Sequence, residues 1–319
     1  MNLLAYIVRK ALTAIPLVLG VTLISFFLMV YHGPDRTYLS AGKNPTEQQL
    51  AEIRHQLGYD RPFLARYIDF LGELTTLELG HSDATGEPVS RLISRTLPVT
   101  IALVLPGFLL GNLLGWILGM YAAWHRDQWI DRVVTTVSVA GMSLSFLVTV
   151  ILLQVILCTP WGFNLFPTRG WDVHDMGSYL HYVTVPTLSL ILVTVGYNTR
   201  FYRALVIEEL ARDHVLTARA YGAGPIALLL THVLKNSLAP ILTRLLFSVP
   251  LIIITGSLLL ESFFGIPGIG KVTFDAITGG DQPVLKAVVS LTAIMLIMVQ
   301  FAMDLIYRQI DPEIGRAHV

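Results

Sequence analysis

Histidine, cysteine and acidic side chains are the residues of this sequence that could do chemistry at a metal ion. Nine histidines and one cysteine occur among 319 residues. His174 and His181 share one connecting stretch with Asp172 and Asp175, and these residue types can bind a divalent cation. The histidines lack i, i+3 or i, i+4 pairing, so we interpret them as solvated and expect no metal site. Cys158 stands alone, which excludes an intramolecular disulfide and a cysteine-rich metal site.

Patterns of catalytic residues give no positive signal either. The sequence places no serine, histidine and acidic residue at the same expected membrane depth, as a catalytic triad would require. The GxxxxGK[ST] loop that holds nucleotide phosphates does not occur. We therefore expect no catalytic residues and no cofactor bound by this chain, which predicts that it is not an enzyme.

The composition is that of a protein dissolved in lipid. Hydrophobic residues make up 54% of the chain and charged residues only 14%, whereas a soluble domain carries about 25% charged residues. The net charge is zero, and no basic block of the kind that neutralises phosphates occurs, so we expect no nucleic-acid partner. The composition predicts a polytopic membrane protein.

Six segments are long and apolar enough to cross a bilayer, which takes about 20 residues. These predicted spans are 11–31, 97–124, 133–158, 183–202, 239–260 and 285–306. Charge enters the last two, with Arg244 near the start of one and Asp304 near the end of the other. Prolines inside spans are tolerated because neighbouring helices can satisfy the freed backbone groups.

The first span could also be a cleavable signal peptide, because Arg9 and Lys10 precede it. Its apolar run is longer than the roughly 7–15 residues of a signal core, and no A-x-A site follows. We therefore expect a retained helix. Short-loop basic residues then favour cytoplasmic termini. The residues that support this orientation are Arg9, Lys10, Arg126, Arg132, Arg203, Arg212, Arg219, Lys235, Arg308 and Arg316.

The long segment 32–96, between the first two spans, reads as folded. In PTEQQLAEIRHQLG, Leu50, Ile53 and Leu57 recur with helical spacing, and FLARYIDFLGELTTL repeats the pattern. The spacing predicts two short helices that form an extracytoplasmic cap.

Four glycines in GFLLGNLLGWILGM follow one another at intervals of four, which places Gly107, Gly111, Gly115 and Gly119 in one stripe on a helix. Such a stripe lets another helix approach closely within lipid. The partner helix could belong to the same chain, or the stripe could form a seam with another subunit or along a pathway. Asn112 is polar at the same depth and could bond a neighbouring helix or touch a substrate.

The stretch ESFFGIPGIGK follows the fifth span and is divided by Gly265, Pro267, Gly268 and Gly270, which predict tight turns. It could be a plain connecting turn, or a rigid re-entrant loop at the outer end of a pathway. Glu261 stands where the apolar run stops. Its carboxylate is either solvated at the interface or makes a specific polar contact.

The stretch DHVLTARAYGAGPIALLLTHVLKN, 213–236, lies between two spans on the predicted cytoplasmic side. Its small residues remove side-chain bulk, and proline is well placed as the first residue of a new helix. A short exposed helix of this kind suits docking of a soluble motor, although an interfacial helix on lipid headgroups fits as well. The candidate docking residues are Asp213, Thr217, Ala218, Arg219, Ala220, Gly222, Gly224 and Pro225.

This stretch resembles the cytoplasmic signature loop of ABC-importer permeases, in the variant of the dipeptide, oligopeptide and nickel family, which reads close to D-Y-V-x-T-A-R-A-K-G with R-N-x-L-x-P downstream. His214, Tyr221 and Lys235 depart from that pattern. The matching residues are Asp213, Val215, Thr217, Ala218, Arg219, Ala220, Gly222, Asn236, Leu238 and Pro240.

The resemblance covers nearly the whole chain. IPLVLGVTLISFFL is similar to the family's first helix, LGYDRPFLARYIDFLGELTTLELGHS to its external cap, and HRDQWIDRVVT to its first cytoplasmic loop. ESFFGIPGIGKVTFDAI and DLIYRQIDPEIG match the family's later segments, whereas YHGPD stands where P-G-D-P is usual.

The resemblance implies an all-α permease of the type I ABC importer fold, with six transmembrane helices and both termini in the cytoplasm of a bacterium. Its implied parts are a first helix within 1–31, a cap at 32–96, a permease core at 97–307 with a coupling loop at about 204–238, and a tail at 308–319. The location implied is the cytoplasmic (inner) membrane, which the chain crosses several times.

The implied partners are a second homologous permease, two cytoplasmic ATPases that bind ATP and Mg, and an extracytoplasmic solute-binding protein. The implied activity is import of dipeptides or short oligopeptides by alternating access, driven through the coupling loop. Nickel chelates, glutathione and antimicrobial peptides are alternative substrates within the family. A stand-alone secondary transporter remains as an alternative class.

Overall fold

The computed structural model of the chain describes residues 15–16, 19–28, 30–31, 37, 45–56, 58–76 and 79–310. The expectations about Arg9, Lys10, Leu57 and Arg316, and about most of the YHGPD stretch, lie outside the described residues.

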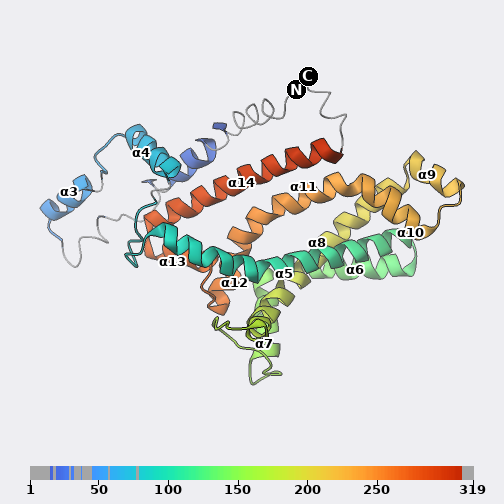
Figure 1. Cartoon of the computed structure of the whole chain (residues 1–319). Helices are drawn as coiled ribbons and strands as arrows, with labels where there is room; N and C mark the ends of the chain where they lie inside the picture. Colours follow the sequence, from blue (N-terminus) through green and yellow to red (C-terminus); the bar gives the residue numbers. More distant parts are fainter. Residues whose placement is uncertain are drawn as a thin grey trace. The chain divides into compact units, whose positions relative to one another are not determined.

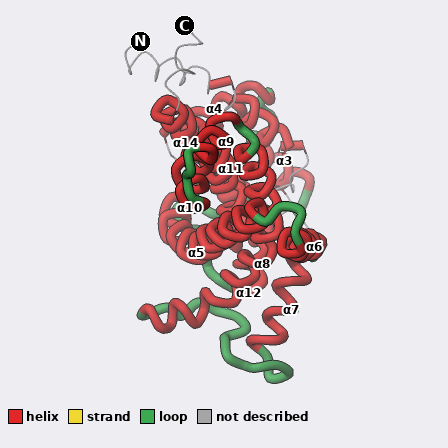
Figure 2. The backbone as a smooth tube through the Cα atoms, turned by 90° about the vertical axis from the view of Figure 1, so that its right-hand side faces the viewer, coloured by secondary structure: helices red, strands yellow, loops and turns green. Residues whose placement is uncertain are grey.

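The described residues form helices joined by loops, without a β-strand among them (Figures 1 and 2). The helices with defined bounds are α3 (Glu47–Gln56), α4 (Phe63–Thr76), α5 (Val89–Trp124), α6 (Trp129–Ser143), α7 (Phe146–Cys158), α8 (Met176–Leu210), α9 (Asp213–Ala220), α10 (Pro225–Ala227), η1 (Leu228–Leu234), α11 (Lys235–Leu251), η2 (Ile252–Gly256), α12 (Ser257–Phe264), α13 (Ile269–Gly279) and α14 (Gln282–Ile310). The all-helical fold class predicted from the sequence is confirmed.

Four helical segments in the described part of the chain are long and apolar enough to cross a membrane. They are Val89–Trp124, Met176–Leu210, Pro225–Phe264 and Gln282–Met303. Each contains or overlaps a predicted span and extends beyond its predicted start. A shorter apolar helix, Leu19–Leu28, lies within the first predicted span. The count of six crossings and the orientation stay predictions.

The predicted span 133–158 is not one straight helix. α6 and α7 meet at an angle of 95°, and together they could form a fifth crossing. Leu144 and Ser145 have extended backbones, with ψ of 130° and 136°, which ends the helical hydrogen bonding. α6 packs closely on α8, because a Cβ at Gly196 would lie 2.6 Å from the carbonyl oxygen of Ser138. Close packing on α8 therefore accompanies the bend.

The chain divides into two compact units. We call Met1–Leu97 with Lys271–Phe301 the N-terminal unit, and Pro98–Gly270 with Ala302–Val319 the core unit.

In the N-terminal unit, both predicted short helices are present as α3 and α4. Phe26, Tyr67 and Phe70 form a buried aromatic cluster there, and the hydroxyls of Thr22 and Tyr67 are hydrogen bonded at 2.9 Å. Their position outside the membrane stays a prediction.

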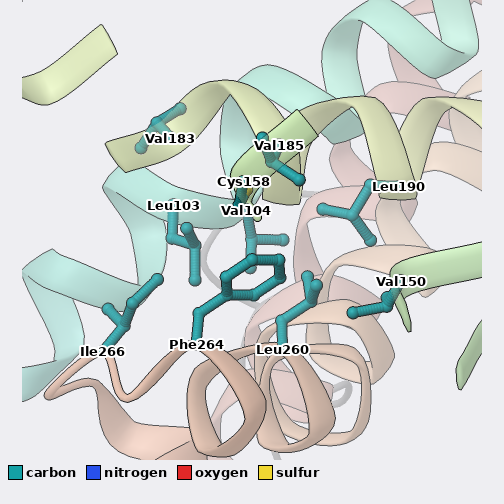
Figure 3. Packing of buried hydrophobic residues seen from close by; sticks show 10 residues of the cluster. All are labelled: Leu103, Val104, Val150, Cys158, Val183, Val185, Leu190, Leu260, Phe264 and Ile266. Atoms are coloured by element: carbon teal, nitrogen blue, oxygen red, sulfur yellow. The ribbon is translucent and has the colours of Figure 1, made fainter. Parts of the chain in front are cut away.

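The core unit is built around apolar side chains from α5, α7, α8 and α12 (Figure 3). Phe264 and Leu260 of α12 face Leu103 and Val104 of α5, and Ile266 adjoins them from the following loop. These side chains are closely packed, as in other protein interiors, and this packing fixes the helices against one another. This packing positions the loop between α12 and α13 and the polar groups described below.

Candidate functional site

The helix α9 is a short element between the long helices α8 and α11 (Figure 1). Arg212, the residue before α9, has an extended backbone. This break separates the axis of α9 from the axis of α8. Val215 is the buried residue of α9, at 2% exposure. It packs in a cluster with Ala123 of α5, Val206 of α8, and Leu228 and Val233 of η1. A single apolar anchor therefore holds α9 onto three other helices.

The remaining surface of α9 and of the turn after it is open. Of the eight candidate docking residues, Ala218 is half-buried against the Val215 cluster. The exposed candidates are Asp213, Thr217, Arg219, Ala220, Gly222, Gly224 and Pro225. Tyr221 protrudes among them with 88% exposure. The segment thus presents a small-residue surface bordered by one large aromatic ring.

The turn after α9 requires glycine. Gly222 has φ of +85°, a conformation that side chains with a Cβ rarely adopt. Its amide donates to the carbonyl of Arg219 at 3.0 Å, and the amide of Ala223 donates to Ala218 at 3.1 Å. Gly224 then precedes α10, with Pro225 as its first residue, as predicted.

The junction between α8 and α9 is held by a buried carboxylate that the sequence analysis missed. Glu209, at 3% exposure, lies 3.0 Å from the Nε of Arg212 and 3.2 Å from the Nε2 of His214. His214 Nε2 also lies 2.8 Å from the side-chain nitrogen of Asn236 on α11. The i, i+3 spacing of Glu209 and Arg212 was the signal available in the sequence. These contacts tie the orientation of α9 to both long helices.

A second ion pair, also missed, lies between α6 and α8. Arg203 donates from Nε and one terminal nitrogen to the two oxygens of Asp131, at 2.5 and 2.6 Å. Asp131 is 4% exposed, and such bidentate pairs fix geometry in two directions. Arg203 entered the sequence analysis only as a marker of orientation.

The glycine stripe on α5 packs against α8 of the same chain. A Cβ on Gly107 would lie 2.9 Å from that of Leu190, and one on Gly119 would lie 2.9 Å from the carbonyl oxygen of Thr199. Gly111 and Gly115 approach α8 more closely still, at Thr194 and Asn198. The geometry favours the packing alternative over a seam with another subunit.

Asn112 has protein partners on both sides of its amide. Its nitrogen donates to the carbonyl of Phe108 at 2.8 Å, and its oxygen accepts from the hydroxyl of Tyr202 at 3.1 Å. The bond to a neighbouring helix is therefore present, and contact of Asn112 with a substrate stays a prediction.

Glu261 makes a specific polar contact and is not solvated. It is fully buried, and its Oε1 accepts a hydrogen bond of 2.5 Å from the hydroxyl of Thr100 on α5. The same hydroxyl accepts from the amide of Ile269 at 2.8 Å. Gly268 packs directly on the Glu261 carboxyl group, and Gly270 on the backbone of α12. Pro267 is exposed at the tip. The loop is thus rigid and pinned to α5.

Replacing Gly268 by alanine is expected to lower the melting temperature of the purified protein, because the new Cβ would overlap the Glu261 carboxyl group. Overpacking of this kind costs about 1–3 kcal/mol. The loss should shrink in an E261A background, where the space is open. Gly279→Ala is the control, since no atom lies within 4 Å of a Cβ there. Strictly additive effects of G268A and E261A would contradict this packing.

The histidine and aspartate group around the start of α8 does not converge on a metal site. Asp175 caps α8, and the backbone N–H and hydroxyl of Ser178 hold the pKa of the Asp175 carboxyl below its usual value. His174 instead contacts Asp172 at 2.8 Å. Across the described residues, no group of three or more potential ligands comes together.

Comparison with protein families gives two adjoining matches. Residues 111–316 match the family described as binding-protein-dependent transport system inner membrane component. Residues 3–104 match the N-terminal region described for membrane components of the same transport systems.

Individual relatives extend over the full length. The di/tripeptide transport system permease protein DppB of Pseudomonas aeruginosa is 32% identical, covering 98% of this chain and 99% of the relative. The glutathione transport system permease protein GsiC of Salmonella typhi is 31% identical, with the same coverage. Among solved structures, an inward-facing MetNI methionine ABC transporter matches with a TM-score of 0.56 and 19% identity. That match covers 70% of this chain and 98% of the other.

The solved structure supports the fold, and the relatives support the family predicted from the loop 213–236. The two family matches meet within α5 and leave few residues outside. The chain therefore belongs to the binding-protein-dependent transport system inner membrane components, the multi-pass permease subunits of ABC transporters.

Proposed function

We propose that this chain is a permease subunit of an ATP-driven importer that moves dipeptides or short oligopeptides across the inner membrane by alternating access. The named activities of the relatives, peptide and glutathione transport, support this substrate class. Glutathione is itself a tripeptide, so it falls within the same range and is the second candidate.

The observation that carries the proposal is the exposed, small-residue surface of α9 and its turn. Val215 anchors that surface to three helices, and the buried Glu209 sets its angle. A force applied to α9 by a soluble protein would therefore reach α5, α8 and α11 together. We assign this surface to a cleft on one of the two ATPase partners.

The remaining components follow from the same assignment. Two cytoplasmic ATPases hold ATP and Mg, a second homologous permease completes the pathway, and an extracytoplasmic binding protein delivers the peptide. This chain contributes no covalent chemistry. Its work is to convert closure of the ATPase pair into a change of access.

The test is purification of the chain from native membranes in mild detergent, with identification of the associated proteins by mass spectrometry. We expect two copies of ATPase per complex and a second permease. Uptake of a radiolabelled dipeptide by the reconstituted complex should depend on ATP and on the binding protein. A chain that transports peptide when purified alone would instead favour a stand-alone secondary transporter.

A further inference from the structure

Arg244 is a cation inside an otherwise apolar helical segment, five positions after the start of the predicted span 239–260. It is the one charged residue between Lys235 and Glu261. It lies nine positions after Lys235, which corresponds to roughly 13 Å along a helix. Ionisable residues within transmembrane segments are rare, face the protein interior or water, and mark pathways for ligands or ions.

The side chain of Arg244 is turned toward α8. One terminal nitrogen donates to the Oδ1 of Asn198 at 3.0 Å, and the guanidinium lies over the ring of Phe201 with its carbon 4.3 Å from the centroid. Asn198 in turn donates to the carbonyl of Gly111 on α5 at 3.3 Å. The guanidinium is therefore held by neutral groups from a neighbouring helix, and it does not extend along its own helix toward the membrane surface.

No carboxylate among the described side chains lies within 4.0 Å of the Arg244 guanidinium, so no ion pair neutralises it there. A guanidinium has five N–H donors in a planar fork. The hydrogen bond to Asn198 uses one of them. The fork thus keeps the capacity to bind a carboxylate through two parallel bonds.

The helix that carries Arg244 also differs from the other long helices. Two π-helical segments, η1 and η2, flank α11. Segments of this type occur frequently at functional sites. Only 12% of its most apolar stretch is buried within the chain, against 28% or more in the other three candidate spans. Arg244 itself is half-buried, so part of its side chain lies at the surface of this chain.

We infer that Arg244 is a substrate-binding residue of the transmembrane pathway, where its guanidinium binds the C-terminal carboxylate of the transported peptide. Asn198 and Phe201 are its positioning residues. The inference rests on the proposed function, because dipeptides, tripeptides and glutathione all carry free carboxylates. The ammonium group of a lysine would supply the positive charge, but it cannot form the two parallel hydrogen bonds that a guanidinium makes with a carboxylate. Lysine is therefore not equivalent at this position.

The experiment uses the complete reconstituted complex with its binding protein, and two dipeptides that differ only in a free or amidated C-terminus. R244Q should raise KM for the free acid about tenfold or more, because it removes the charged partner of the carboxylate. Its effect on the amide should be small. R244K should fall between R244Q and the unaltered protein.

The ratio of variant to unaltered protein is taken for each peptide separately, since the binding protein also contacts the C-terminus. Thr243→Val is the matched control on the same helix, and it should leave both ratios unchanged. If the complex does not transport the amide, binding is measured instead, on the complex without its binding protein. Competition between the acid and the amide then gives the ratio of variant to unaltered protein for each peptide.

Three results would overturn the inference. Equal loss of acid and amide transport in R244Q would mean that Arg244 only supports packing. Loss of the second permease from the purified R244Q complex would mean that the counter-ion is a carboxylate of that subunit. An unaltered complex that transports neither peptide would refute the proposed function, and this outcome is visible before any variant is made.

Discussion

Replacing Gly115 by leucine is expected to prevent stable packing of α5 on α8, so that little monodisperse protein is recovered in detergent. Any Cβ at this position would overlap that of Asn198 and would lie 3.2 Å from the backbone nitrogen of Thr199. Backbone atoms cannot rotate away as a flexible side chain can. The two helices must therefore separate, and the hydrogen bond from Asn198 to Gly111 would be lost with them.

Alanine at Gly115 provides the graded version of this test. It adds only the Cβ, and overpacking in a close-packed interior costs about 1–3 kcal/mol. We expect a lower melting temperature for G115A and a near-normal one for Gly141→Ala, where a Cβ would meet a single atom at 3.9 Å. A G115L protein that is recovered with normal yield and melting temperature would show that α5 does not pack on α8 through this stripe.

The glycine stripe also shows what a sequence can and cannot predict. Spacing of four residues predicts a smooth helix face, because side chains at i and i+4 share one side. It does not name the helix that packs there. The partner, α8, begins more than 50 residues after the last glycine of the stripe, Gly119. The choice between a neighbouring helix and another subunit therefore needed the structure.

The long helices were predictable because about 20 apolar residues suffice to identify a span. The bend between α6 and α7 was not predictable from the sequence. The helix ends at Leu144 and Ser145, and neither residue is a proline or glycine that would indicate a break. The contact of Glu261 with Thr100 was similarly beyond sequence reasoning, because 161 residues separate the two. The glycine–proline pair, in contrast, correctly predicted the break at Gly224 and the new helix at Pro225.

The second large effect is expected at the turn after α9. Replacing Gly224 by leucine should abolish peptide uptake while membrane insertion and melting temperature stay normal. Gly224 has φ of −71° and ψ of 162°, which any residue adopts, and no atom lies within 4 Å of a Cβ there. The added side chain therefore meets open space in this chain, and it can obstruct only a partner that docks on the surface.

Gly222→Val separates docking from backbone strain. Gly222 has the same open surroundings but a φ of +85°, so a substitution there adds a conformational cost of about 1–2 kcal/mol. We expect G222V to abolish uptake and also to lower the melting temperature. Gly222→Asn should be less strained, because asparagine tolerates positive φ better than valine.

The measurement is uptake of radiolabelled dipeptide together with recovery of the ATPase on the purified variants. A loss of about 1.4 kcal/mol in docking already weakens binding about tenfold, so reduced ATPase recovery should accompany the loss of uptake. Gly72→Leu is the control, as another exposed glycine without an atom within 4 Å of its Cβ. If G224L retains both uptake and ATPase, the surface of α9 and its turn is not the docking site, and an interfacial helix resting on lipid headgroups becomes the better interpretation of this segment.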